Sequence, residues 1–214
     1  DDYGRWNALQ YYARRFYASL LVSSRVKDGT LFVHVVCDKA AQTPASLRVR
    51  IMKFDGTVIS EKTKAITLPA LSAETYMQIP VDNFSKMSGV DLARTFAAMD
   101  LEVNGKQVSS NVIYFVPTKD VHLPVAHIQS QLTQGNGFYN LHLSSGVLAR
   151  SVYISFGDDN AKLSDNYFDL LPGESRNIRV HSKVDMARLE KNIKIVSLAD
   201  AFVTSPAQKG VAWK

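Results

Sequence analysis

Apolar residues of the N-terminal segment recur at spacings of three and four, the spacing that lines one face of a helix. This stripe consists of Trp6, Leu9, Tyr12, Ala13, Phe16, Tyr17 and Leu20. The polar residues Asn7, Gln10, Arg14 and Arg15 occupy the other side. A helix this short is marginal in water, so most of its stability has to come from the surface that it covers. The pattern predicts an amphipathic helix that packs on a further structural element.

From about Ser19 onward the apolar positions alternate, which is the repeat of a half-buried β-strand. The strand-like segments of the first half are residues 20–26, 31–37, 46–52, 57–60, 65–68, 75–79, 98–103 and 112–116. Tight hairpin turns are expected at Asp28-Gly29, Asp55-Gly56 and Asn104-Gly105. A helical turn is expected around residues 91–96. Seven or eight short strands in about one hundred residues are typical of a β-sandwich.

Pro117 to Asp120, followed by Pro124, interrupts this pattern and predicts a domain boundary. The strand-like segments of the second half are residues 126–132, 137–143, 147–156, 167–171, 175–181 and 193–198. A short helix is expected at residues 186–191, and residues 207–214 read as a loose end whose Val211 and Trp213 are able to dock. The predicted fold class is all-β: two β-sandwich domains, residues 19–118 and 119–214, preceded by one amphipathic helix within residues 1–18.

Composition excludes several classes of protein. The chain has 214 residues, 46% hydrophobic and 21% charged, as in an ordinary globular protein, and no apolar run long enough to span a membrane. The net charge of +5 comes from basic residues scattered among acidic ones, so nucleic-acid binding is not expected. Cys37 is the single cysteine and lies in an apolar strand, which predicts a buried thiol. The first residue is Asp1, without an initiator Met or an apolar signal segment, as expected of a piece of a longer protein.

The polar residues form no recognisable catalytic or metal-binding pattern. Hydrolysis of a glycoside usually takes two carboxylates, and none of the five glutamates lies in a context that suggests burial beside a second acid: Glu61, Glu74, Glu102, Glu174 and Glu190. The histidines occupy separate segments without metal-ligand spacing: His34, His122, His127, His142 and His181. Asp158 and Asp159 are expected to be solvated turn acids, and Asp165, Asn166 and Asp169 to supply polarity to turns and strand ends. We therefore predict no catalytic, cofactor-binding or metal-binding residue, and no cofactor.

Four aromatic residues of the second half are candidates for a platform on which a sugar could stack. They are Tyr153, Phe156, Tyr167 and Phe168. Because they alternate with polar residues along their strands, packing in the core is the favoured interpretation.

Two segments resemble one known family. Residues 2–17, with the sequence DYGRWNALQYYARRFY, are similar to the segment that closes the catalytic barrel in β-mannosidases of glycoside hydrolase family 2, where it forms the last barrel helix. Residues 163–174, with the sequence LSDNYFDLLPGE, resemble a signature of the immunoglobulin-like domain at the C-terminus of the same enzymes. Both segments occur in the family's order, and together with the sandwich between them the resemblance covers essentially the whole chain.

The resemblance implies that residues 1–18 are the last helix of a catalytic (β/α)8 barrel that lies outside this chain. The barrel would pack on the stripe Trp6, Leu9, Ala13 and Phe16, and without it this stripe would allow the chain to self-associate. The intact parent would be a metal-independent retaining hydrolase that removes terminal β-linked mannose. Family members place a catalytic glutamate directly after an asparagine; this sequence has no Asn-Glu pair, so no catalytic residue is carried over.

Other interpretations stay open. The chain could be an independent carbohydrate-binding module, with exposed aromatic residues on one sheet face or at one loop end. It could also be a tandem of immunoglobulin-like domains from a bacterial surface or adhesion protein, although that leaves the N-terminal helix unexplained. No residue assigns the compartment; the resemblance implies a periplasmic or extracellular parent in bacteria and a lysosomal one in eukaryotes.

Overall fold

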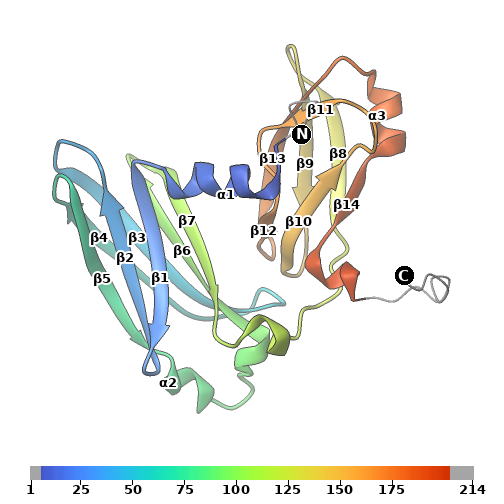
Figure 1. Ribbon diagram of the computed structural model, residues 1–214. Helices are drawn as coiled ribbons and strands as arrows, with labels where there is room; N and C mark the ends of the chain where they lie inside the picture. Colours follow the sequence, from blue (N-terminus) through green and yellow to red (C-terminus); the bar gives the residue numbers. More distant parts are fainter. Residues whose placement is uncertain (1–5, 203–214) are drawn as a thin grey trace, which may run out of the picture. The chain divides into compact units, whose positions relative to one another are not determined.

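The computed structural model describes residues 6–202, which form mainly antiparallel β-sheets (Figure 1). They divide into two compact units: a first domain of residues 8–122, and a second domain of residues 123–202 that also includes Trp6 and Asn7. A short helix, α1 (Ala8–Phe16), comes before the first strand. The predicted fold class, two immunoglobulin-like β-sandwiches preceded by one helix, is confirmed. Leu20, the last residue of the apolar stripe, lies in the first strand and is buried there.

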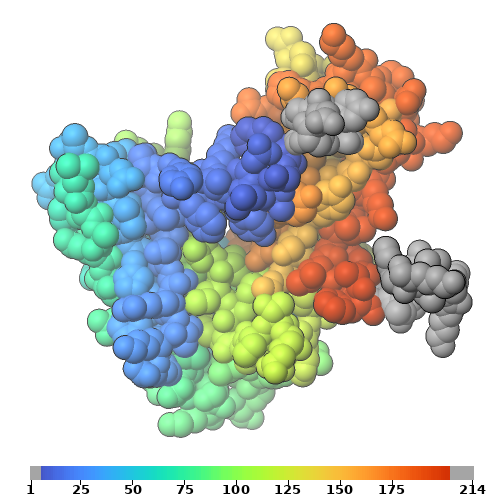
Figure 2. All heavy atoms as spheres, in the orientation of Figure 1, coloured from blue at the N-terminus to red at the C-terminus, as the bar shows by residue number. Residues whose placement is uncertain are grey.

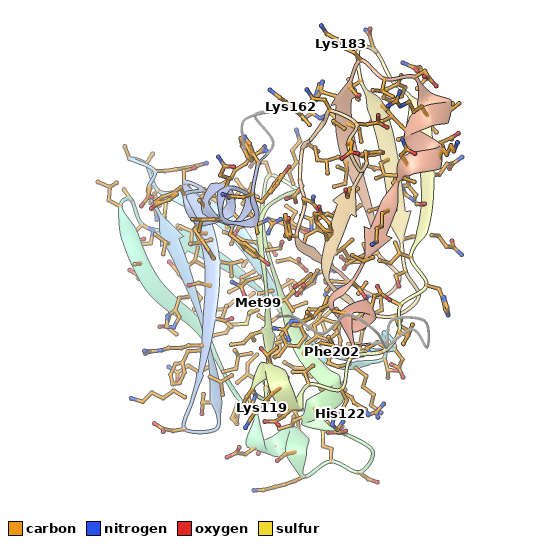
Figure 3. The ribbon with its side chains drawn as sticks, turned by 45° about the vertical axis from the view of Figure 1, so that its right-hand side comes forward. Met99, Lys119, His122, Lys162, Lys183 and Phe202 are labelled. Atoms are coloured by element: carbon orange, nitrogen blue, oxygen red, sulfur yellow. The ribbon has the colours of Figure 1, made fainter. Side chains whose placement is uncertain are left out.

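The first domain has two antiparallel sheets. One has the strand order β1-β2-β5 and the other β4-β3-β6-β7. The strands are β1 (Leu20–Lys27), β2 (Thr30–Cys37), β3 (Thr43–Lys53), β4 (Val58–Leu68), β5 (Ser72–Pro80), β6 (Thr95–Val103) and β7 (Lys106–Tyr114). Short helical turns connect or follow them: α2 (Asp82–Ser85), η1 (Leu92–Arg94) and η2 (Thr118–Asp120). Lys119 and His122 lie in the segment after β7 (Figure 3), where the His122 amide donates to Ala93 O at 2.9 Å.

Two predicted hairpins of the first domain are confirmed with their turn geometry. Asp28 and Gly29 have φ angles of 48° and 67° and join β1 to β2, whose last pair is Lys27 with Thr30. Asn104 and Gly105 have φ angles of 52° and 71° and join β6 to β7. Positive φ at both central residues defines the type I′ turn, whose twist matches that of the flanking strands.

Alternate residues of the strands fill the space between the two sheets of the first domain. The buried residues include Leu31, Val33, Val35, Leu47, Val49, Ile51, Ala97, Met99 and Leu101 (Met99 is labelled in Figure 3). Cys37 belongs to the same core, as predicted. At one side of the sandwich the two sheet edges are joined by side chains, since the Val22 amide donates to Ser109 Oγ at 3.0 Å and Asn111 Nδ2 donates to Val22 O at 3.4 Å.

The sequence pattern missed two features of this domain. Residues 57–60 and 65–68 were predicted as separate strands, but they are the two ends of the continuous strand β4. Arg50 alternates with the core residues Val49 and Ile51 and so lies on the outer face, yet it is buried there, where its Nη2 lies 2.8 Å from Asp100 Oδ2. Arg48 Nη2 reaches the same oxygen at 3.1 Å. A strand pattern predicts which face a side chain takes, but not what covers that face.

The second domain has the same architecture, with sheets ordered β12-β10-β14 and β11-β13-β9-β8. The strands are β8 (Gln129–Gln134), β9 (Tyr139–Ser144), β10 (Ala149–Ser155), β11 (Ala161–Leu163), β12 (Phe168–Leu170), β13 (Ser175–Ser182) and β14 (Lys194–Val196). The helix α3 (Met186–Asn192) matches the predicted crossing helix, and η3 (Leu198–Ala201) follows β14. The core includes Leu141, Leu143, Val152, Ile154, Phe156, Phe168, Ile178, Val180 and Leu189.

The clearest differences from the prediction in this domain concern strands β8 and β11. Strand β8 begins at Gln129 instead of residue 126, because Ala126 is buried in the core without joining the ladder with β9. Strand β11 was not predicted, and its three residues pair with β13. The expected loose end at residues 207–214, with Val211 and Trp213, lies outside the described residues.

Candidate functional site

The structure corrects the expectation for Asp159. This residue is buried rather than solvated. Asn192 Nδ2 donates to Asp159 Oδ2 at 2.7 Å, and Arg188 Nη2 lies 2.7 Å from Oδ1. The hydrogen bond from Asn192, together with Arg188, lowers the pKa of the Asp159 carboxyl below its ordinary value. The acid is not solvated because two residues of α3 reach the turn that carries it.

The polar residues of the LSDNYFDLLPGE segment hold the chain around strand β10. Ile154 N donates to Asn166 Oδ1 and Asn166 Nδ2 donates to Ile154 O, both at 2.9 Å. Ser151 N donates to Asp169 Oδ1 at 2.8 Å. Arg176 Nη2 lies 3.0 Å from Asp165 Oδ2. The side chains of Asp165, Asn166 and Asp169 therefore hold turns and strand ends in place.

The four candidate stacking residues of the second domain fall into two groups. Phe156 and Phe168 are buried in the core, as the alternation predicted. Tyr153 and Tyr167 are half-buried and contact each other, with ring centroids 5.1 Å apart. Burial, and then the neighbouring Tyr153, raise the pKa of Tyr167. Since each tyrosine ring lies against the other, the pair is part of the packing around β10.

The glutamates and histidines, considered above as catalytic or metal-binding residues, are dispersed over the structure. Glu102 is half-buried and the other glutamates are exposed. His34 Nδ1 lies 2.8 Å from Thr75 Oγ1, and His142 Nδ1 lies 2.8 Å from Asn177 Oδ1. Within residues 6–202, no three side chains of His, Cys, Asp or Glu come together as a metal site would require. In the same range no helix has the length and apolar character needed to cross a membrane.

Helix α1 and the residues on either side of it expose most of the large apolar side chains of the predicted stripe. Leu9 is 74% exposed, Phe16 60% and Tyr17 89%, and Trp6 and Tyr12 are exposed as well. Figure 2 shows the dark-blue atoms of this segment at the surface of the molecule. Exposed apolar side chains gathered on one face are typical of a surface that binds another protein element.

The buried side of α1 is a different one. Tyr11 is the buried residue of this helix, with 5% of its surface exposed. With about 3.6 residues per turn, Tyr11 faces away from Leu9 and Phe16. The burial of Tyr11 was not predictable from the sequence, because two adjacent tyrosines, Tyr11 and Tyr12, give no signal as to which of them is covered. The helix therefore leaves its more apolar face to solvent.

Two families of known domains match this chain in tandem. A family described as a mannosidase Ig/CBM-like domain matches residues 29–120, and a mannosidase family described as an Ig-fold domain matches residues 123–201. This chain belongs to the C-terminal immunoglobulin-like domains of glycoside hydrolase family 2 β-mannosidases. The two matches correspond to the two sandwiches of these mannosidase-type domains.

The relatives are larger proteins. The β-mannosidase of Capra hircus is 25% identical over 208 residues, and that of Mus musculus is 24% identical over 205 residues. Each alignment covers 93% of this chain and 23% of the relative, so the chain spans about a quarter of the length of these enzymes. The mannosidase-type domains are thus known as parts of larger enzymes, consistent with packing against a catalytic domain.

Solved structures show the same fold. The β-D-mannosidase of Dictyoglomus thermophilum superposes with a TM-score of 0.75 at 22% identity, over 88% of this chain and 22% of the enzyme. The exo-chitosanase of Amycolatopsis orientalis gives a TM-score of 0.64 at 19% identity, over 92% of this chain and 27% of the enzyme. At these identities the similarity concerns the fold alone.

Proposed function

We propose that this chain is the non-catalytic accessory region of a longer retaining exo-β-mannosidase, which removes terminal β-linked mannose from the non-reducing end of its substrates. In this proposal residues 1–18 are the last helix of the catalytic (β/α)8 barrel, and the two sandwiches, residues 19–118 and 119–214, support that barrel. The β-mannosidase relatives and the family membership support the parent activity. The single observation that carries the accessory role is the exposed apolar face of α1.

Packing against the catalytic barrel explains why α1 carries an apolar face that this chain leaves exposed. An isolated helix of nine residues is marginal in water, and most helices in proteins are stabilised by covering an apolar surface. Fully burying a Leu or Phe side chain contributes about 1.5–3 kcal/mol. Leu9 and Phe16 are both more than half exposed, so most of this contribution is available for binding a barrel.

The parent enzyme provides the test, since the barrel is needed for both activity and packing. We expect Leu9→Asp, in the longer enzyme, to lower the melting temperature and the rate of hydrolysis of 4-nitrophenyl β-D-mannoside. Leu71→Asp is the matched control, because Leu71 is 75% exposed, about as much as Leu9, and lies outside the helix. Equal effects of the two substitutions, or no effect of Leu9→Asp, would contradict the role of α1.

The 214-residue chain alone gives a second test of the same proposal. We expect no turnover of aryl β-mannosides by this chain, and activity that survives repurification would overturn its non-catalytic role. The exposed face also predicts concentration-dependent self-association, which sedimentation velocity measures and Leu9→Asp should reduce.

In the parent enzyme, deletion of residues 119–214 should lower stability or alter kinetics. Unchanged values of both would contradict a supporting role.

Sugar binding by the first domain is a second candidate function, and one observation favours it. On the outer face of the sheet β1-β2-β5, the rings of Phe32 and His34 have centroids 6.5 Å apart and planes within 8° of each other. The Arg25 guanidinium lies 5.5 Å from the Phe32 ring, and Thr75 contacts His34. An aromatic surface flanked by hydrogen-bonding groups is the kind of site on which a sugar ring stacks.

Titration calorimetry with β-linked mannooligosaccharides tests this second function. Phe32→Ala should abolish the heat of binding. The matched control is Phe138→Ala, since Phe138 in the second domain also has a histidine and an arginine beside its ring, His181 at 5.7 Å and Arg179 at 5.9 Å. Absence of binding by the unsubstituted chain would exclude this function.

A further inference from the structure

The chain contains two Asn-Gly pairs in exposed turns, and their backbones differ. Asn104 and Gly105 form the type I′ turn between β6 and β7, with φ angles of 52° and 71°. Asn136 and Gly137 lie in the loop between β8 and β9, where Gly137 has a φ of 77° and Asn136 is not among the residues with positive φ. Both asparagines are exposed. Asn-Gly is the pair most open to loss of the side-chain amide, because glycine has no Cβ to hinder its own nitrogen.

We propose that Asn104 is a site of spontaneous deamidation in the folded protein, and that the hairpin turn selects it over Asn136. The Gly105 nitrogen attacks Asn104 Cγ and loses its proton, the Cγ–Nδ2 bond breaks, and the amide leaves as ammonia. Water then opens the resulting five-membered imide at either carbonyl, which gives aspartate or isoaspartate at position 104. Each event lowers the formal net charge of +5 by one.

The geometry of the turn explains why Asn104 reacts in preference to Asn136. Ring closure requires the Gly105 nitrogen to eclipse Asn104 Cβ, at a ψ of about −120°, which is the value of the first central residue in a type II′ turn. Types I′ and II′ both fit two-residue hairpins, and they differ mainly by a flip of the central peptide. Asn104 already has the positive φ that type II′ needs. An added Cβ would meet no atom within 4 Å at either Gly105 or Gly137, so the two sites differ in the φ of the asparagine and not in the space around the glycine.

Asn136 lacks this route. Its φ would have to change sign together with ψ, which moves the chain on both sides of the turn. The loop resists such movement because the Gly135 amide donates to Phe138 O at 2.8 Å. Gly135 is also close to Phe138, since a Cβ on Gly135 would lie 2.9 Å from that oxygen. The imide at position 104 therefore forms within the existing hairpin, whereas the imide at position 136 requires the loop to open.

Peptide mapping by mass spectrometry tests this selection on the full chain. The folded protein is incubated in mildly alkaline buffer, and incorporation of heavy oxygen from labelled water marks each new carboxylate. We expect Asn104 to convert several times faster than Asn136 in the folded chain, and the two to convert at similar rates in the urea-unfolded chain. Gly105→Ala should slow conversion at Asn104 alone, and Asn104→Asp should leave Asn136 as the slow remaining site. Conversion of Asn136 as fast as Asn104 in the folded chain, or no difference between folded and unfolded rates, would overturn the proposal.

Discussion

At the scale of single residues, the Asn166 side chain replaces a missing stretch of strand. Strand β12 pairs with β10 through Val152 and Phe168, and the ladder would next join Ile154 to position 166. Tyr167 has a φ of 54°, so the backbone has left the sheet at this point. The Asn166 amide, which both donates and accepts, completes the hydrogen bonds of Ile154 from within the core.

Replacing Asn166 by Ala should destabilise the second domain. The substitution leaves the N–H and C=O of Ile154 without these partners in a buried position, and an unsatisfied buried group costs about 1–3 kcal/mol. The expected loss is measured by urea denaturation. Asn177→Ala is the control, because Asn177 bonds His142 on an exposed sheet surface and should change the free energy of unfolding by less than about 0.5 kcal/mol.

Gly29 and Gly105 occupy equivalent positions in two hairpin turns of the first domain. Both have positive φ in type I′ turns, so Ala at either position should cost about 1–2 kcal/mol for the left-handed backbone. A Cβ on Gly29 would in addition overlap the Asp82 carboxylate, whereas one on Gly105 meets nothing. Gly29→Ala should therefore lower the free energy of unfolding more than Gly105→Ala does. Equal losses in urea denaturation would contradict this role of Asp82.

At the scale of secondary-structure elements, α3 is attached to the sandwich by polar as well as apolar contacts. Asp185 caps its first turn by accepting from the Arg188 amide at 3.0 Å. Leu189 is fully buried in the core. Arg188 and Asn192 bind Asp159 on the turn that follows β10. The helix was predictable from its sequence pattern, but the contact with Asp159, more than twenty residues away, was not.

This attachment predicts a dependence of stability on pH. The folded pKa of Asp159 lies below its unfolded value, so the charged carboxylate stabilises the fold above about pH 4, and this contribution is lost as the pH falls through the folded pKa. Asp159→Asn should reduce the loss of stability on acidification. The measurement is the urea midpoint of the second domain between about pH 6 and pH 3. Asp158→Asn is the exposed control, and an unchanged acid profile of Asp159→Asn would refute the prediction.

At the scale of the whole molecule, each domain has a hydrophobic core of its own. The buried cluster of the first domain is built mainly from β1 to β6, and that of the second from residues between Ala126 and Leu189. Chains with separate cores commonly unfold in more than one step. Nothing in the spacing of apolar residues distinguishes one large core from two, but the prolines at 117 and 124 mark the division.

Calorimetry should therefore resolve two unfolding transitions. Asn166→Ala is expected to lower the midpoint of one of them, and Gly29→Ala the midpoint of the other. A single transition that both substitutions lower equally would show that the two domains unfold as one unit.

The sequence by itself determined the all-β class, the two sandwiches, the hairpins at Asp28-Gly29 and Asn104-Gly105, and the mannosidase family. These follow from local information: the period of apolar residues, the prolines at 117 and 124 between the two halves, the φ preferences of turn residues, and two contiguous motifs. Only the tertiary structure decided that Asp159 is buried, that Arg50 pairs with Asp100, and that α1 buries its Tyr11 and exposes its Leu9 and Phe16. Those outcomes depend on which distant segments meet, because burial and ion pairing are properties of three-dimensional neighbours, and a one-dimensional pattern does not contain them.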